Sequence, residues 1–102
     1  MTLPEITLQR AQDIVATKTA PKVTLESIEA KIQNTEFILH SQLTIAIITM
    51  YNGFMVTGVS APASAANYDR EVGKRYAYDN AFKQLWQLEG YLLREKLSAG
   101  PV

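Results

Sequence analysis

The sequence predicts an α+β domain: a short three-stranded antiparallel meander, with helices before it and a long helix after it. Two observations carry this prediction. The segment Leu43–Tyr51 is rich in isoleucine and threonine, which suit a pleated surface, and the tight-turn pair Asn52-Gly53 follows it directly. The segments on both sides of this region instead repeat apolar residues at helical spacing. The change in the spacing of apolar residues marks the boundaries between the helical segments and the sheet.

The length of the chain favours a single small domain with a modest core. A chain of 102 residues buries only about two-thirds of its unfolded surface on folding, so a partner subunit would add considerably to its stability. We divide the chain into an N-terminal helix with a linker, residues 1–22, and one α+β domain, residues 23–102.

Two helices are expected before the sheet. The first runs from Pro4 to about Ala16 behind a Thr2 cap, and the polar, proline-containing stretch 17–22 reads as a linker. The second runs from Leu25 to about Asn34. Its cap is Thr24, and its apolar positions are Leu25, Ile28 and Ile32.

The strands of the meander are expected at Phe37–Leu39, at Leu43–Tyr51 and after Gly53, with a turn at His40–Gln42. Asn-Gly supplies the two positive-φ residues of a two-residue type I′ turn, which would pair Tyr51 with Phe54.

Both faces of the resulting hairpin are apolar. One face would carry Leu43, Ile45, Ile47, Thr49 and Tyr51 with Phe54 and Val56; the other would carry Ala46, Ile48, Met50, Met55, Thr57 and Val59. The sheet must therefore be covered twice, by its own helices on one side and by more helix or another subunit on the other. We expect a homodimer with Ile48, Met50, Met55 and Val59 at its surface. The alternative is a monomer in which the N-terminal helix folds over this face.

The remainder of the chain is strongly helical and ends at Gly100-Pro101, with Ser64 or Asn67 as its cap. It forms one long helix or two helices joined at a bend near Trp86. Gly73, Ala77 and Ala81 recur at intervals of four and form a narrow stripe, which predicts close packing against the sheet or a partner helix.

Several motifs resemble a family of small tailed-phage proteins named after gene forty-nine of one coliphage and gene sixty-six of a Shigella phage. The resemblance covers about Val23 to Leu97, and its motifs are Asn52-Gly53-Phe54, Val56-Thr57-Gly58, and the runs 67–75, 77–81 and 85–97. Family members usually have proline where this chain has Ala65 and Gln87, which implies a helix start near Ala65 and a break after Trp86. Gln87 permits the helix to continue here. The resemblance implies a phage protein and no particular activity.

No catalytic constellation is visible in the sequence. The chain has no cysteine, its single histidine, His40, lies in a turn, and no glycine-rich loop joins a strand to a helix. We therefore expect no enzyme, no cofactor and no metal. Equal numbers of acidic and basic residues, 10 of each, argue against nucleic acid as a partner. No segment reaches the roughly 18 apolar residues of a membrane span, so we expect no membrane partner and place the protein in the host cytoplasm.

One polar cluster is a candidate binding site. Lys74, Arg75 and Tyr78 share a face of the long helix with Glu71, and a cation can lie against the tyrosine ring. This cluster is either an ordinary solvated helix face or a patch that binds an anionic ligand or a protein partner.

Two functions remain open on the sequence. The first is a non-enzymatic phage accessory protein that binds a host or phage protein. The alternative is a small-ligand binder that captures a nucleotide-like molecule, for example a host defence signal, in a pocket between subunits.

Overall fold

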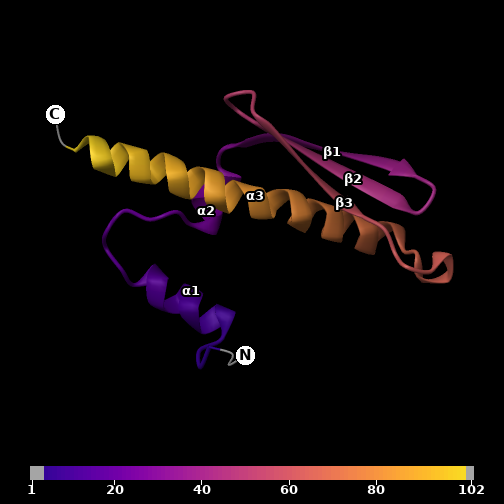
Figure 1. Cartoon of the computed structure of the whole chain (residues 1–102), viewed down its shortest axis with the longest axis horizontal. Helices are drawn as coiled ribbons and strands as arrows, with labels where there is room; N and C mark the ends of the chain where they lie inside the picture. The colour runs from indigo at the N-terminus through magenta and orange to yellow at the C-terminus, as the bar shows by residue number, and fades with distance from the viewer. Residues whose placement is uncertain (1–3, 101–102) are drawn as a thin grey trace.

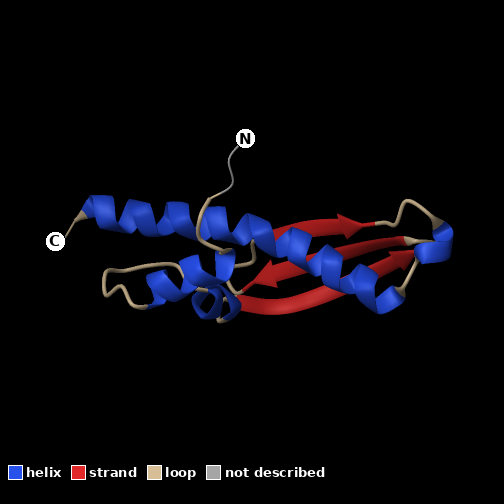
Figure 2. Cartoon of the chain, turned by 90° about the horizontal axis from the view of Figure 1, so that it is seen from below, coloured by secondary structure: helices blue, strands red, loops and turns tan. Residues whose placement is uncertain are grey.

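A computed structural model describes residues 4–100 and confirms the α+β architecture (Figure 1). The helices and strands follow in the order α1 (Leu8–Ala16), α2 (Leu25–Glu29), β1 (Ile32–His40), β2 (Leu43–Met50), β3 (Met55–Ser60), η1 (Ala65–Asn67) and α3 (Arg70–Ala99). The strands form an antiparallel sheet in the order β1-β2-β3. Helix α3 crosses one side of this sheet and packs on β2 and β3 (Figure 2). No helix within residues 4–100 covers the other side (Figures 1 and 2).

Helix α1 begins later than the predicted start at Pro4, because Thr7 forms its cap. The Thr7 hydroxyl accepts a hydrogen bond from the Arg10 backbone N–H at 3.1 Å. The predicted cap, Thr2, lies outside the described residues. No side chain of α1 is fully buried, and Figure 1 shows the helix set apart from the sheet and from α3.

Helix α2 has the predicted cap but is shorter than expected. Thr24 and Ser27 form a reciprocal capping box, with hydrogen bonds of 3.0 Å and 2.9 Å. The helix ends at Glu29 because the chain then turns toward β1, and just before that strand the Lys31 carbonyl accepts a hydrogen bond from the Tyr51 N–H at 2.9 Å. Ile28 is fully buried, as predicted, whereas Leu25 is half exposed. Ile32 belongs to a strand rather than to this helix.

Strand β1 is longer than the predicted segment Phe37–Leu39, and it starts at Ile32. Its pairing with β2 runs from Ile32 opposite Met50 to His40 opposite Leu43, with one irregularity near Ile32. The predicted turn at His40–Gln42 is present, and Ser41 adopts a φ of 54° there.

The hairpin between β2 and β3 has a different register from the predicted one. The Met50 N–H donates to the Phe54 carbonyl at 2.8 Å, so a three-residue loop of Tyr51, Asn52 and Gly53 replaces the two-residue type I′ turn. Gly53 is the only loop residue with positive φ, at 90°, which suits a type I turn followed by a glycine. The Asn52 backbone does not adopt the positive φ that a type I′ turn requires. Its side-chain oxygen instead accepts a hydrogen bond from the Phe54 N–H at 2.9 Å.

This one-residue shift turns every β3 side chain to the face opposite the predicted one. We call the face against α3 the inner face; its β2 and β3 residues are Thr44, Ala46, Ile48, Met50, Val56 and Gly58, all of them buried. We call the opposite side the outer face; its β2 and β3 residues are Leu43, Ile45, Ile47, Thr49, Met55, Thr57 and Val59. Val56 therefore packs in the core and Met55 does not.

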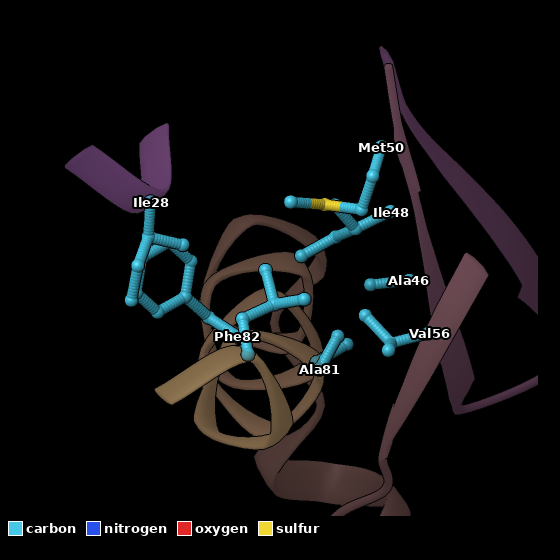
Figure 3. Close-up of a cluster of buried hydrophobic side chains, with 9 residues drawn as sticks. Ile28, Ala46, Ile48, Met50, Val56, Ala81 and Phe82 are labelled. Carbon is cyan, nitrogen blue, oxygen red and sulfur yellow. The ribbon is translucent and has the colours of Figure 1, made fainter. Parts of the chain in front are cut away.

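The core lies between the inner face and α3. Its buried residues are Ile28 of α2, Ala46, Ile48, Met50 and Val56 of the sheet, and Ala77, Ala81, Phe82 and Leu85 of α3. Figure 3 shows the sheet residues pointing toward α3 and Ile28 approaching Phe82 from the other side of that helix. All these contacts lie on one side of the sheet.

Helix α3 runs without a break through Gln87, from its cap at Asp69 to Gly100. A separate turn, η1, is capped by Ser64 and precedes it. A helix of 30 residues is about 45 Å long, whereas the eight-residue strand β2 spans about 27 Å. The C-terminal half of α3 therefore extends past the sheet (Figure 1). Its small-residue stripe packs on the sheet, as predicted, with Gly73 against Thr44.

Candidate functional site

The structure divides the four residues of the predicted dimer surface between opposite faces of the sheet. Ile48 and Met50 lie in the core, with 0% and 5% of their surface exposed. Met55 and Val59 lie on the outer face, with 56% and 50% exposed. The prediction that these four residues form one surface is therefore wrong. The cause is the three-residue hairpin loop, which shifts β3 by one residue relative to β2.

The outer face nevertheless forms a continuous apolar surface. Ile38 lies opposite Ile45, and Ile45 lies opposite Val59, so one aliphatic row crosses all three strands. Leu43 and Ile47 flank this row on β2, and Met55 lies farther along β3, beyond Thr57. The titratable side chains of the face are Glu36 and His40, both on β1 and one on each side of Ile38. Such a surface is unusual for a strand face left in water.

Lys74, Arg75 and Tyr78 line one wide hollow of about 960 Å³ beside β1. Helix α3 provides one wall, and the aromatic rings of Phe37 and Trp86 also border the hollow. The Lys74 ammonium lies 5.9 Å from the centre of the Phe37 ring, and the Arg75 guanidinium lies 5.7 Å from the centre of the Tyr78 ring. The predicted contact between a cation and Tyr78 is present, and it is made by Arg75.

Acidic neighbours offset both cations of this cluster. Arg75 forms an ion pair with Asp79 at 2.7 Å, and Lys74 lies 3.7 Å from Glu71. Partial burial raises the pKa of the Tyr78 phenol; Glu29 raises it further, Arg75 lowers it and Asp79 raises it. Tyr78 therefore keeps its proton at neutral pH and can donate a hydrogen bond. The hollow offers aromatic rings and paired charges rather than an excess of positive charge.

A second hollow, of about 440 Å³, lies between the hairpin loop and the overhanging half of α3. We call it the tip hollow. Its lining is largely apolar and consists of Met50, Tyr51, Phe54, Leu85, Leu88 and Leu92, together with Asn52 and the ion pair between Lys31 and Glu89. The sequence patterns considered above do not predict this site. The available signal was the pair of aromatic residues flanking Asn52-Gly53, followed by leucines at helical spacing from Leu85.

Within residues 4–100, no group of three or more histidine, aspartate or glutamate side chains could hold a metal ion. The same part of the chain contains no helix long and apolar enough to cross a membrane. His40 is exposed at the end of β1.

The comparisons with known proteins agree with the resemblance carried by the sequence motifs. Residues 23–97 match the Phage protein (N4 Gp49/phage Sf6 gene 66) family, a range that begins just before α2 and ends near the end of α3. Neither a curated protein nor a solved structure shows significant similarity to the chain. Because the matched range covers most of the 102 residues, the chain belongs to the Phage protein (N4 Gp49/phage Sf6 gene 66) family.

Proposed function

We propose that this phage protein is not an enzyme and acts in the host cytoplasm by binding a host or phage protein at the tip hollow. The observation that carries this proposal is the concentration of exposed large apolar side chains around that hollow. Tyr51 and Phe54 are 69% and 54% exposed, and Leu88 and Leu92 stand beside them on α3.

The tip hollow has the features of a protein-binding surface. Binding interfaces draw most of their energy from a few aromatic and aliphatic anchors surrounded by a polar rim. Tyr51 and Phe54 supply the anchors, and the ion pair of Lys31 with Glu89 supplies charge at the rim. A hollow bordered by a helix on one side and a hairpin loop on the other suits an apolar side chain or amphipathic helix of a partner.

The test compares two lysine substitutions in infected cells. Tagged protein carrying Leu88→Lys, in the tip hollow, is compared with wild type and with Val59→Lys, an apolar position on the outer face that is at least as exposed (50% against 41%). We expect wild type and Val59→Lys to capture the same phage or host protein, and Leu88→Lys to lose it. The purified partner should then bind Leu88→Lys at least about tenfold more weakly than wild type, which corresponds to about 1.4 kcal/mol.

Equal capture of every specific protein by all three forms would contradict the proposal. The same holds for a purified partner whose affinity is unchanged by Leu88→Lys.

The hollow beside β1 supports a second candidate function, the binding of a small nucleotide-like ligand. The supporting observation is that Phe37, Tyr78 and Trp86 border the same hollow as Lys74 and Arg75, so aromatic rings and cations that suit a base and a phosphate lie together. The paired carboxylates of Glu71 and Asp79 weigh against it. For this reason we place it second.

A thermal-shift screen against nucleotides separates the two candidates. A ligand present at about 100 times its dissociation constant should stabilise the protein by about 2.7 kcal/mol. The nucleotide-induced rise in the unfolding midpoint should disappear in Lys74→Gln, because this substitution removes a positive charge from the lining of the hollow. If no nucleotide shifts the midpoint, the small-ligand candidate fails and the tip-hollow proposal is unaffected.

A further inference from the structure

We propose that the outer face of the sheet is covered by the outer face of a second copy of this chain. This inference does not rest on the proposed function, because the outer face and the tip hollow are formed by different side chains. A second copy would explain why a three-stranded sheet carries apolar side chains on both sides while α3 covers one side only.

The composition of the outer face favours a cover of apolar side chains. Exposed apolar side chains occur on both edge strands: Ile38 on β1 and Met55 and Val59 on β3, each about half exposed. Between them, Ile45 and Ile47 of β2 are only partly buried. An antiparallel sheet that faces water on one side normally alternates apolar and polar residues, and here the solvent-facing positions of β2 are mainly isoleucine and leucine.

The outer face is also complementary to itself. Glu36 and His40 lie two residues before and two residues after Ile38 on the same strand and the same face. A two-fold rotation about the row of Ile38, Ile45 and Val59 stacks this aliphatic row on its counterpart. The same rotation brings Glu36 of each copy toward the end of the strand that carries His40 in the other copy. The chain has no net charge, so two copies do not repel one another at long range.

The area of the outer face is large enough for a dimer interface. Three strands about 4.8 Å apart and about eight residues long, at about 3.3 Å per residue, present roughly 400 Å² in projection. Two such faces together, with the relief of their side chains, come to about 1,000 Å², the lower limit for a specific interface. The dimer should therefore be specific but should dissociate on dilution.

Helix α1 of the same chain does not cover the outer face. The α1 side chains Leu8 and Val15 border a hollow of about 620 Å³ together with Leu25 and Trp86. That hollow lies on the α3 side of the molecule, because Trp86 belongs to α3. Figure 1 likewise shows α1 on the side of the sheet that carries α3.

Size-exclusion chromatography with light scattering on the full chain tests for this dimer. Because self-association depends on concentration, the protein concentration is varied from about 1 to about 200 μM. Wild type should approach twice the single-chain mass of 11.4 kDa at the highest concentration and fall toward that mass on dilution. Val59→Lys and Met55→Lys should remain at the single-chain mass throughout, with circular dichroism unchanged. Leu88→Lys, the matched control in the tip hollow, should behave as wild type does.

A milder variant covers the case in which a lysine on the sheet disturbs folding. Val59→Thr keeps the β-branched shape and replaces one methyl group by a hydroxyl, and it should raise the dissociation constant at least about threefold. A wild type that stays at the single-chain mass at about 200 μM would overturn the proposal. A dimer that survives both lysine variants would overturn it as well, because its interface would lie elsewhere. Either of these two results would leave the proposed binding of a partner protein at the tip hollow unaffected.

Discussion

Gly58 of β3 lies directly against Ala81 of α3. A Cβ atom on Gly58 would stand 2.9 Å from the Ala81 Cα and would overlap the Ala81 nitrogen and the Ala77 carbonyl oxygen. Ala77 and Ala81 are themselves fully buried. The helix therefore rests on the backbone of the strand with no side chain between them. This contact sets the distance between α3 and the sheet and hence the shape of the core.

The first prediction concerns this contact. Gly58→Ala should destabilise the fold by about 3 kcal/mol, the upper end of the usual cost of overpacking, because the added methyl meets backbone atoms that cannot turn aside. Gly90→Ala is the matched control: a Cβ there meets nothing within 4 Å. It lies inside α3, so the control should stabilise the protein by about 0.5 to 1 kcal/mol. Urea denaturation measures both changes. Equal midpoints for the two variants would mean that α3 does not lie on Gly58.

A second prediction concerns Thr44, which is fully buried on the inner face against Gly73. Its hydroxyl is buried and has no hydrogen-bond partner in the structure. Thr44→Val exchanges the hydroxyl for a methyl group of similar shape, so it should stabilise the protein by about 1 kcal/mol. Thermal unfolding monitored by circular dichroism measures the difference. A lower midpoint for the variant would show that this hydroxyl makes a hydrogen bond of value to the fold.

The third prediction separates the two methionines on either side of the hairpin loop. Met50→Lys would place an unpaired charge in the core and should cost about 3 kcal/mol or more, a large part of the stability of a small domain. Met55→Lys should change the unfolding free energy by no more than about 0.5 kcal/mol, because that side chain lies on the outer face. The comparison requires denaturation at low micromolar concentration, where any dimer is dissociated. Similar losses in both variants would contradict the assignment of the two residues to opposite faces.

Tyr78 gives a fourth prediction, in alkaline solution. Its pKa is raised above the usual value of about 10, chiefly by burial, so the fold favours the protonated phenol. The stability that this provides is fully present below about pH 10 and is lost as the pH rises through the raised pKa. Ultraviolet titration of the chain's 5 tyrosines should show a late-ionising phenol that is absent from Tyr78→Phe. An unchanged titration curve in the variant would show that Tyr78 ionises like an exposed tyrosine.

The sequence predicts the number, type and order of the elements well, because these follow from local patterns. The Asn52-Gly53 pair indicates the hairpin, Thr24 indicates the start of α2, and the small-residue stripe from Gly73 indicates a close contact with the sheet. Each of these signals lies within a few residues of the structure that it specifies.

The hairpin register could not be predicted in this way, because Asn-Gly fits a three-residue loop as well as a two-residue turn. The choice depends on contacts with a distant helix: the observed register places Gly58 under Ala81, where only a glycine fits. The tip hollow could not be predicted from local patterns either, because it depends on where the far half of α3 lies relative to the hairpin loop. That hollow exists because α3 continues past the sheet beside Tyr51 and Phe54.

The hairpin register assigns Met50 and Val56 to the core and Met55 and Val59 to the outer face. Nuclear magnetic resonance tests it directly, because opposed residues of an antiparallel pair bring their α-protons close together at non-hydrogen-bonded positions. We expect close α-proton contacts between Thr49 and Met55 and between Ile47 and Thr57. Close α-proton contacts of Met50 with Met55 and of Ile48 with Thr57 would instead show the two-residue turn and would contradict the observed register.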